Sequence, residues 1–371
     1  MKTTVDGLAV ASRFATRGNA VLCGGYGAGH INTTLLVATD AGRLYILQRI
    51  NTDIFRHPDE LMQNIVAVTE HLQKKAADPR HALRLVPTRD GRPYLTLEDG
   101  GCWRMYDFVL DGVCLQAAET PEDFYQSAVA FGEFQNLLAD FPAERLYPVI
   151  PNFHNTVNRY ENLKAAVDAD VCGRVADVQA ELDGFLAREE TGGTLHRMME
   201  SGALPLRVTH NDTKLNNVML DLDTRRPLCV IDLDTVMAGL SLYDFGDSIR
   251  FGASTAAEDE RDLSRVELSL PLFETYVRGY LSACGNALTE AEKNLLPLGA
   301  KIMTLECGVR FLTDYLQGDT YFHTSRPGQN LDRARTQLRL VEDMEKKWAR
   351  MEEIAAREGE LAAHERGTGG T

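Results

Sequence analysis

The chain has 371 residues, of which 44% are hydrophobic, 25% are charged and 8% are aromatic. At about 150 residues per domain, this length predicts two domains or lobes. The composition excludes collagen-like and wholly disordered chains. Acidic residues outnumber basic ones by 54 to 39, a formal charge of −15, so the chain as a whole does not attract nucleic acid or anionic lipid.

The amino-terminal residues lack the apolar core and the cleavage pattern of a signal peptide. No stretch approaches the length of uninterrupted apolar sequence that a transmembrane helix needs. The seven cysteines are scattered and form no C-x-x-C pair, as in proteins of a reducing compartment. We therefore expect a cytoplasmic protein, a monomer or weak dimer, with neither nucleic acid nor membrane among its partners.

The first 108 residues predict a small antiparallel sheet. Helical spacing at 6–16 and an amphipathic pattern at 58–75 predict two helices, of which the second is the main one. Apolar runs bounded by turn residues predict strands, at 20–23, 34–39, 44–50, 83–86, 94–97 and 103–110. We expect these elements to form an N-lobe, 1–108, that ends in a hinge near 103–110.

After this hinge the sequence has mostly helical periodicity, over 121–138, 159–187, 263–281, 298–316 and 331–361. We expect a larger helical C-lobe at 111–346, followed at 347–371 by a helix end and a flexible tail. The predicted fold class is therefore α+β with two lobes, and the active site is expected in the cleft between them.

The segment 210–217, HNDTKLNN, has an Asp and an Asn five residues apart at the ends of a short polar loop. In phosphoryl transfer an aspartate accepts the proton of the attacking hydroxyl, and an asparagine oxygen ligates Mg²⁺. We therefore assign Asp212 as the candidate catalytic base and Asn217 as a metal ligand. Taken alone, so short a pattern is more often that of a polar surface loop.

A second acidic segment follows closely. Two apolar β-runs, 218–220 and 228–231, end in Asp232-Leu233-Asp234. A carboxylate at a strand end can bind a divalent ion rigidly. Acidic residues at i and i+2 share a face if the strand continues, whereas a turn at Leu233 separates them. Asp232 is the predicted main metal ligand, with Asp234 either supporting it or binding a second metal.

The third segment with chemical meaning is GGYGAGH, residues 24–30, between two β-runs. A strand, glycines and a second strand lay backbone N–H groups over the phosphates of ATP. A dinucleotide-binding loop would instead lead into a helix, and an ordinary glycine-rich hairpin is the remaining alternative. The residues assigned to this phosphate-covering site are Gly25, Gly27, Gly29, Asn32 and Thr33.

Together, HNDTKLNN and VIDLDT resemble the signature of the aminoglycoside phosphotransferase-like small-molecule kinases, relatives of the protein kinases. More narrowly, GHINTT, YILQRIN, IDLDT, YDFGDSIRFGAST and ECGVRFLTDYLQGDTYF look like the bacterial N-acetylhexosamine 1-kinases. The resemblance extends from Leu8 to Lys346 and implies a bilobal protein-kinase-like fold. It also implies ATP- and Mg²⁺-dependent phosphorylation of the C1 hydroxyl of N-acetylglucosamine or N-acetylgalactosamine.

The resemblance implies roles for further residues. Adenine would lie against the hinge, with Tyr106 and Phe108 as its contacts. Protein kinases hold the α- and β-phosphates with a strand lysine, and the matching stretch here, YILQR, offers only Arg49; otherwise the glycine loop and Mg²⁺ hold them. Asp244, in a later DFG triplet, is implied to be structural, tying down the catalytic loop.

A neutral sugar needs a few hydrogen-bonding groups and an apolar wall. Glu306, Arg310 and Asp314 share a helix face, which by itself indicates an exposed stripe of salt bridges. The interleaved aromatic residues and the resemblance place this segment at the acceptor site instead. The residues assigned to sugar binding are His30, His210, Asn211, Glu306, Arg310 and Tyr321.

Two other functions fit the same motifs. A kinase of the same fold could phosphorylate homoserine, choline, methylthioribose or an aminoglycoside, and the charge of −15 suits a cationic acceptor. A non-catalytic, nucleotide-binding pseudokinase is the other alternative, supported only by the missing strand lysine and opposed by the intact set of Asp212, Asn217 and Asp232.

Overall fold

The computed structural model describes residues 6–27 and 31–368. Contacts between Cα atoms divide the chain into two compact units. The first contains the residues up to 113 together with 144–151 and 219–237, and the second contains 114–143, 152–218 and the residues from 238 onward. Two short segments that are distant in sequence thus belong to the same unit as the amino-terminal sheet.

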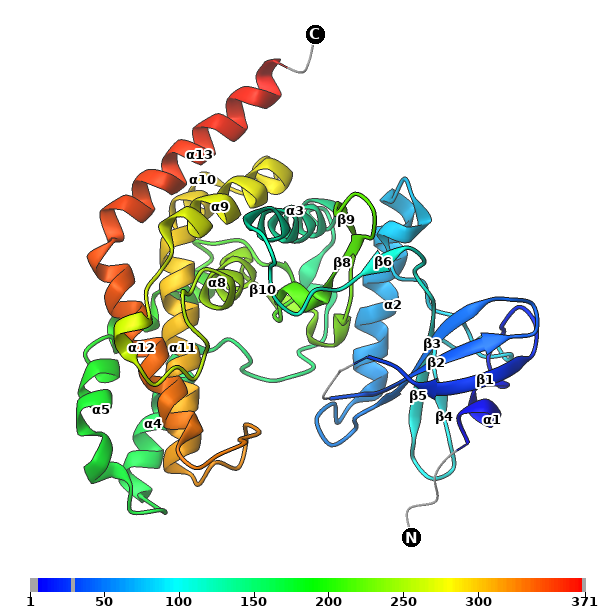
Figure 1. Cartoon of the computed structure of the whole chain (residues 1–371), viewed down its shortest axis with the longest axis horizontal. Coiled ribbons are helices and arrows are strands. Elements are labelled where there is room, and N and C mark those ends of the chain that lie inside the picture. The colour runs from blue at the N-terminus through cyan, green and yellow to red at the C-terminus, as the bar shows by residue number, and fades with distance from the viewer. Residues whose placement is uncertain (1–5, 28–30, 369–371) are drawn as a thin grey trace. The chain divides into compact units, whose positions relative to one another are not determined.

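A five-stranded sheet in the order β1-β2-β3-β5-β4 forms the centre of the first unit (Figure 1). Its strands are antiparallel, with bounds β1 Ala20–Gly25, β2 Thr33–Thr39, β3 Leu44–Ile50, β4 Leu95–Thr96 and β5 Cys102–Asp107. Because side chains alternate between the faces of a strand, Val37, Leu47 and Met105 point to one side, where they are buried with helix α1, Gly7–Ala11. The predicted small antiparallel sheet is confirmed.

The main helix of the first unit is α2, Pro58–Lys75, and one of its polar residues joins the two distant segments to it. The side-chain amide of Asn64 is buried and donates to the carbonyl oxygens of Tyr147, at 2.9 Å, and Val236, at 3.0 Å. A three-stranded sheet in the order β6-β8-β9 completes this part of the fold, with bounds Gly112–Val113, Val218–Asp221 and Pro227–Val230.

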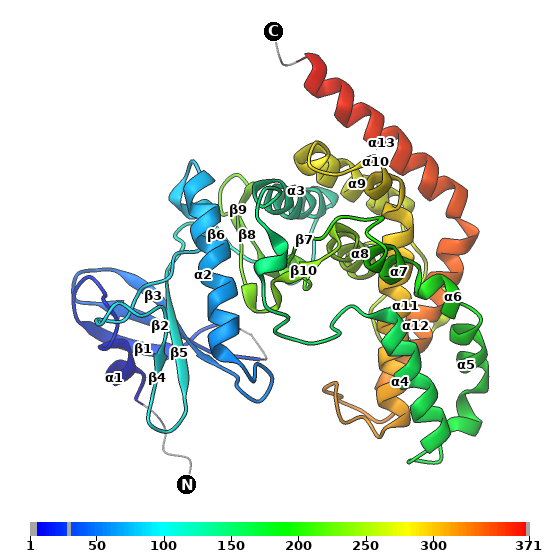
Figure 2. The same ribbon diagram turned by 180° about the vertical axis from the view of Figure 1, so that it is seen from behind.

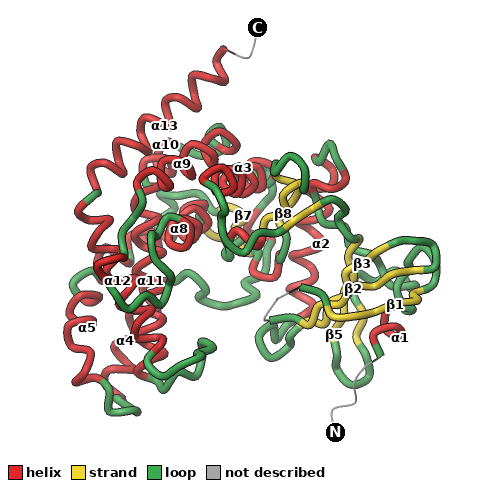
Figure 3. The backbone as a smooth tube through the Cα atoms, viewed as in Figure 1, coloured by secondary structure: helices red, strands yellow, loops and turns green. Residues whose placement is uncertain are grey.

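The second unit is built from helices (Figures 2 and 3). Helix α11, Leu296–Leu316, is its central element and packs against α4, α8 and α12. Only a short two-stranded sheet, β7 (Arg207–Thr209) with β10 (Met237–Gly239), interrupts the helical pattern among its described residues. The other helices are α3 Pro121–Leu137, α4 Thr156–Ala169, α5 Gln179–Leu186, α6 Glu189–Gly192, α7 Thr194–Glu200, α8 Ser241–Gly252, α9 Leu270–Cys284, α10 Glu290–Asn294, α12 Gln329–Lys346 and α13 Trp348–Thr368.

Close contact between α8 and α11 requires glycine. A Cβ atom on Gly246 would lie 2.3 Å from the carbonyl oxygen of Gly299, and one on Gly299 would lie 2.8 Å from the carbonyl oxygen of Leu242. Neither backbone can move away without separating the helices, because both helices are in the packed interior. The glycine of the DFG triplet is therefore a packing residue inside a helix.

Several predicted boundaries were wrong. The helix expected at 159–187 ends at Ala169, because Asp170 and Gly173 have left-handed backbones (φ 35° and 64°) that stop an α-helix. The helix expected at 331–361 is divided into α12 and α13. Residues 83–86 contribute a single bridge, from Leu85 to Tyr106, instead of a strand. No helix among the described residues is long and apolar enough to cross a lipid bilayer.

Candidate active site

The loop that follows β7 carries the predicted base. Asn217 ends a single 3₁₀ turn, and its Nδ2 donates to the main-chain oxygen of Asp212 at 2.8 Å and to its carboxylate at 3.0 Å. The ammonium of Lys214 lies 2.8 Å from the other carboxylate oxygen. The structure thus brings Asp212 and Asn217 together. The Asp212 side chain is 29% exposed, so its carboxylate can accept a proton from a bound ligand.

Asp244 holds this loop in place from α8. Its carboxylate accepts the backbone N–H groups of His210 and Asn211, at 2.8 and 2.7 Å, and the side-chain amide of Gln135 at 3.0 Å. Burial raises the pKa of the Asp244 carboxyl, and the neighbouring His210 and the N–H donors oppose that rise. Asn211 has a left-handed backbone (φ 66°), which these bonds help to hold. Asp244 therefore has the structural role that the resemblance implied.

The structure places His210 in the scaffold of the loop. Its side chain is fully buried, edge-on to Phe131 and Phe134 with ring centroids 5.5 and 5.9 Å away. Its Nδ1 accepts the backbone N–H of Asp212 at 3.3 Å. A ring enclosed in this way has no surface for a sugar, so the prediction that His210 contacts the acceptor is corrected. Asn211 is buried as well, and its amide donates to the main chain two residues back.

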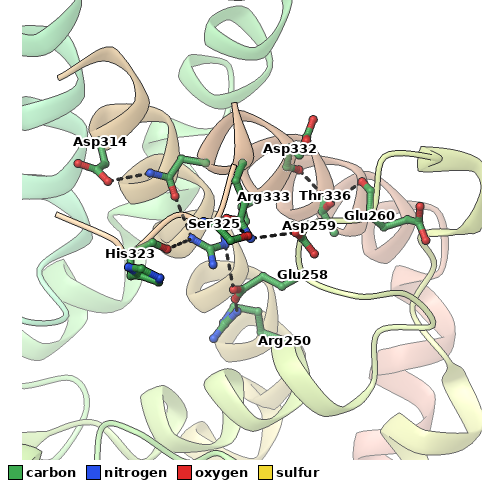
Figure 4. A network of polar contacts seen from close by, with 12 residues as sticks. Arg250, Glu258, Asp259, Glu260, Asp314, His323, Ser325, Asp332, Arg333 and Thr336 are labelled. Carbon is green, nitrogen blue, oxygen red and sulfur yellow. Dashed lines mark hydrogen bonds and ion pairs between the residues drawn. The ribbon is translucent and has the colours of Figure 1, made fainter. Parts of the chain in front are cut away.

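Asp247 extends the support of the loop into an ionic network. Its carboxylate accepts the backbone N–H of Thr213 at 3.3 Å and two N–H groups of Arg250 at 3.1 and 3.0 Å. Figure 4 shows that Arg250 and Arg333 meet at the carboxylate of Glu258, with N···O distances of 2.7 and 3.6 Å. The residue next to Asp212 is thus tied through ion pairs to helix α12.

Electrostatic interactions join this loop to the predicted acceptor segment. Burial acts to raise the pKa of the Asp247 carboxyl, but the charges of Arg250, Lys214 and His154 outweigh it and lower that pKa. His154 precedes α4, and its Nδ1 lies 2.8 Å from the carboxylate of Glu306 on α11. The catalytic loop and α11 therefore influence one another within the second unit.

Glu306 holds other residues of the acceptor segment in place. It is 1% exposed, and its two oxygens accept hydrogen bonds from His154 at 2.8 Å and from the Thr156 hydroxyl at 2.7 Å. The carboxylate is thus bound within the protein, so its predicted contact with the sugar is replaced by a role in orienting His154. Asp314 is buried too and accepts the backbone N–H of Tyr321 at 2.8 Å. The alternative of an exposed stripe was wrong.

Arg310 lies among aromatic rings. Its guanidinium carbon is 5.7 Å from the ring centroid of Phe153, 5.9 Å from that of Tyr321 and 5.3 Å from that of Phe322. Burial acts to lower the pKa of Arg310, but Cys307, Glu306 and a hydrogen bond to Tyr321 raise it. Tyr321 is itself 66% exposed. The structure therefore brings together two predicted sugar contacts, Arg310 and Tyr321, beside an aromatic wall.

The buried polar atoms of this segment without a hydrogen-bond partner among the described residues include Nε2 of His154, the hydroxyl of Tyr243 and Nε of Arg159. The rings of His154 and Tyr243 lie 5.2 Å apart, and the His154 side chain is only 7% exposed. Buried polar groups are nearly always hydrogen-bonded, so such a pair marks a place for a ligand or a water. Burial acts to raise the pKa of Glu306, and His154, Arg310 and Arg159 lower it, so its negative charge is balanced by cations.

The predicted metal segment belongs to the first unit. Asp232 follows β9 with a left-handed backbone (φ 60°, ψ 60°), and a 3₁₀ turn at Leu233–Thr235 comes next. The turn thus separates the two acidic residues, the second of the arrangements that the sequence allowed. Asp234 is buried and bonded through its carboxylate to Arg104 and Asn32, so its part is to support the turn.

The donor atoms fit a hard cation such as Mg²⁺. Because Nδ2 of Asn217 is committed to Asp212, the oxygen Oδ1 is the atom of Asn217 that can ligate. Asp232 offers a carboxylate. Among the described residues, no group of three His, Cys, Asp or Glu side chains could hold a metal by itself. Mg²⁺ keeps several waters and binds substrate phosphates along with one or two protein oxygens, and oxygen is the donor atom that each of these two side chains offers.

The described part of the glycine-rich segment ends β1, which pairs with β2 in an antiparallel arrangement. β1 and β2 pair as far as Gly25, and Gly27 has the positive φ of 74° that favours glycine. A Cβ atom on either glycine would meet no atom within 4 Å, so the surface here is open. The ring of Tyr26 lies edge-on to that of Phe108, the predicted adenine contact, with centroids 5.8 Å apart. Gly29 and His30 lie outside the described residues.

The other predicted nucleotide contacts, Tyr106, Asn32 and Thr33, differ from one another in burial and bonding. Tyr106 is buried in β5, 5% exposed. Asn32 uses its amide nitrogen on Asp234 and its oxygen on the backbone N–H of Asn51, at 3.0 Å, so it is a structural link. Thr33 begins β2 and is exposed.

Arg49 lies on the opposite face of the sheet from Asp234. β3 pairs Arg49 with Trp103 and Gln48 with Arg104, and successive side chains of a strand point to opposite faces. Arg104 bonds both Gln48 and Asp234, whereas Arg49 is exposed on the other face. The cation that pairs with Asp234 is therefore Arg104, while the phosphate contact assigned to Arg49 stays a prediction.

Sequence reasoning missed Lys214, Arg104, His154 and Tyr243. Lys214 lies two residues after the predicted base, so its spacing was a usable signal. Arg104 interrupts the apolar run WRMYDF, and a charge inside a predicted strand of a buried sheet needs a partner. Nothing local distinguished His154 and Tyr243, because the partners that define them are distant in sequence.

Residues 24–282 match the family model of the phosphotransferase enzyme family, APH. An aminoglycoside phosphotransferase from Alicyclobacillus acidocaldarius superposes with a TM-score of 0.57 at 13% identity, covering 98% of each chain. An amicoumacin kinase in complex with AMP-PNP, Ca²⁺ and amicoumacin has a TM-score of 0.59 at 14% identity, covering 90% of this chain and 92% of that one. An ethanolamine kinase from Plasmodium vivax has a TM-score of 0.52 at 15% identity, covering 84% of this chain and 80% of that one.

At these identities the structural neighbours show a shared protein-kinase-like fold, while the family match extends over most of the chain and includes residues 210–217 and 232–235. The protein therefore belongs to the APH phosphotransferase family and is a small-molecule phosphotransferase.

Proposed function

We propose that the protein transfers the γ-phosphoryl group of ATP, with Mg²⁺, to the anomeric C1 hydroxyl of N-acetylglucosamine or N-acetylgalactosamine. The main support is the pair of buried, unpartnered polar atoms, Nε2 of His154 and the hydroxyl of Tyr243, beside the balanced charges of the acceptor segment. Because Nδ1 of His154 lies 2.8 Å from the Glu306 carboxylate, Nε2 is the ring nitrogen left for a ligand, and the Tyr243 hydroxyl can donate or accept. Such a pair suits the hydroxyl and amide groups of an acetamido sugar.

The charges of the acceptor segment oppose a cationic substrate. Choline, ethanolamine and aminoglycosides carry positive charge, which uncompensated carboxylates or free aromatic faces would bind. Glu306 is already neutralised by His154, Arg310 and Arg159. A positively charged acceptor would have to displace these cations or lie beside them, and like charges in a buried site repel strongly. The aromatic rings around Arg310 offer a wall for the apolar face of a sugar ring.

The catalytic loop supplies the chemistry. Asp212 orients the acceptor hydroxyl and accepts its proton as the oxygen attacks phosphorus. Lys214 forms an ion pair with Asp212 at 2.8 Å and provides positive charge beside the transferring group. Asn217 and Asp232 would hold the metal, which when bound neutralises charge on the phosphates. The hydrogen bonds of Asp244 keep the loop rigid, so most of the rate comes from positioning.

A panel of acceptors tests the proposal. The purified protein is incubated with ATP, Mg²⁺ and N-acetylglucosamine, N-acetylgalactosamine, galactose, choline or homoserine, and phosphorus NMR identifies the product. We expect an anomeric phosphate from the acetamido sugars. A protein that phosphorylates choline or homoserine in preference to both acetamido sugars would contradict the proposal, and binding of Mg-ATP without turnover of any acceptor would favour a pseudokinase.

A conservative substitution tests the acceptor segment more directly. Tyr243→Phe removes only the unpartnered hydroxyl and should raise KM for the acetamido sugar about 2- to 10-fold, the worth of one hydrogen bond, with KM for ATP unchanged. Tyr125→Phe on α3, a tyrosine whose ring contacts Arg278, is the matched control and should leave both constants unaltered. Equal acceptor KM values in the two variants would remove Tyr243 from the site.

A further inference from the structure

Arg104 is a buried cation at the centre of the first sheet. Its side chain is 1% exposed, and it lies on β5 opposite Gln48 of β3. Its Nε donates to the side-chain oxygen of Gln48 at 3.0 Å, and its Nη1 forms an ion pair with Asp234. A charged side chain so enclosed is costly unless its partners are fixed, so Arg104 and Asp234 determine one another's positions.

Asp234 is bound from two directions. One carboxylate oxygen accepts from Arg104, and the other accepts from Nδ2 of Asn32. Asn32 in turn accepts the backbone N–H of Asn51 at 3.0 Å, at the end of β3. Asp234 therefore links Asn32, which precedes β2, to Arg104 on β5. Asn32 extends the link to Asn51 at the end of β3.

This arrangement bears on Asp232, two residues earlier. Asp232 has a left-handed backbone, a strained conformation for a residue with a side chain, which persists only where surrounding contacts hold it. Asp234 supplies contacts to the following turn, and the side-chain amide of Asn64 adds a bond to the carbonyl oxygen of Val236 at its end. Burial acts to lower the pKa of Arg104, but interactions with Asp234, Tyr106 and Asp232 raise it well above its ordinary value. Arg104 is therefore attracted electrostatically by both acidic residues of the segment, Asp232 and Asp234.

We infer that Arg104 is a positioning residue of the nucleotide–metal site: through its ion pair with Asp234 it holds the turn that carries Asp232, and so directs the Asp232 carboxylate toward the cation. The inference rests on the proposed function, in which Asp232 is a metal ligand. Residues that orient a metal ligand usually change metal affinity or activity about 10- to 100-fold when they are replaced. Arg104 itself touches neither phosphate nor metal in this scheme.

The test separates positioning from a purely structural role by measuring how much Mg²⁺ strengthens nucleotide binding. Isothermal titration with AMP-PNP, with and without Mg²⁺, requires no turnover. Arg104→Met alone would leave Asp234 buried and unpaired, so the double variant Arg104→Met/Asp234→Asn removes both charges while keeping an acceptor for Asn32. Arg43→Met, an exposed arginine at the β2–β3 turn, is the matched control.

We expect the double variant to fold and to bind AMP-PNP without Mg²⁺ as the natural chain does, but to lose about 10- to 100-fold of the strengthening that Mg²⁺ brings. Hydrogen exchange at residues 233–236 in the metal-free protein should also be faster in the double variant and unchanged in Arg43→Met. A folded double variant with undiminished strengthening by Mg²⁺ would overturn the inference alone. If Mg²⁺ fails to strengthen AMP-PNP binding in the natural chain, the inference and the proposed function both fail.

Discussion

Replacing Asp212 with asparagine tests the catalytic assignment with little change of shape. The amide keeps one oxygen that can accept the hydrogen bond from Asn217, which now lies at 3.0 Å from the carboxylate. It cannot accept the proton of the acceptor hydroxyl. A general base contributes about 10²- to 10⁴-fold to turnover, which raises the barrier by about 3 to 5.5 kcal/mol.

The same substitution should have little effect on stability. The ion pair that it removes, between Asp212 and Lys214, has side chains that are 29% and 41% exposed. Ion pairs that remain in contact with water contribute about 1 kcal/mol or less. The loop is held mainly by Asp244 and Asp247, whose bonds go to the backbone of neighbouring residues and are untouched. Loss of turnover would therefore not be explained by unfolding.

The assay couples ADP release to an optical signal at saturating acceptor, with thermal unfolding and AMP-PNP titration performed on the same preparations. Asp223→Asn, at an exposed position between β8 and β9, is the matched carboxylate-to-amide control and should retain full turnover. We expect Asp212→Asn to keep its nucleotide affinity. A folded Asp212→Asn variant that retains more than about a tenth of the natural turnover would refute the base assignment, because even the weakest general bases contribute more than that.

Three further substitutions test the scaffold, each followed by thermal or denaturant unfolding. Asp244→Asn should lower the free energy of unfolding by about 1.5 to 3 kcal/mol, the worth of a hydrogen bond to a charged group. The reason is that an amide cannot accept from every donor that now surrounds the carboxylate. An unchanged unfolding midpoint would refute this. Gly246→Ala should cost about 1 to 3 kcal/mol, because the methyl group would overlap the backbone of Gly299; wild-type stability would show that α8 and α11 can separate freely. Burial acts to raise the pKa of Glu292, but bonds from Arg207, Thr289 and Ser241 lower it below its ordinary 4.5. Its ionised form therefore stabilises the fold above about pH 4.5, and that contribution is lost as the pH falls through the lower folded-state pKa. Glu292→Gln leaves Arg207 unpaired and should lower the free energy of unfolding by about 3 to 5 kcal/mol at neutral pH. The difference in stability between the variant and the natural chain should shrink in acid. A difference in stability independent of pH would contradict the reasoning.

Local sequence was most informative where the chemistry lies within one short loop. Asp212 and Asn217 are five residues apart in one short loop, so the spacing predicted that both belong to one site, whereas their contact at 3.0 Å is a finding of the structure. The antiparallel sheet was likewise predictable, because alternating apolar residues and intervening turn residues determine which neighbours pair.

Boundaries and burial were less predictable. The helix expected at 159–187 stops where Asp170 takes a left-handed conformation. Asp adopts this conformation more readily than most residues, but its presence in a sequence does not predict that it will do so. Helical spacing placed Glu306 and Arg310 on one face, yet spacing is the same for a face in solvent and a face against His154 and Thr156. Whether a helix face is exposed depends on which other parts of the chain pack against it, and these can be distant in sequence.

The sequence by itself determined the small antiparallel sheet, the helical remainder and the catalytic motif, because these depend on periodicity and on contacts a few residues long. Only the tertiary structure decided which cation accompanies Asp234, since Arg104 reaches it across 130 positions of sequence, whereas Arg49 lies on the other face of β3. It also decided that Glu306 orients His154, from 152 positions away. A buried charge must be paired, and the packing of the fold decides which oppositely charged side chains lie close enough to pair with it.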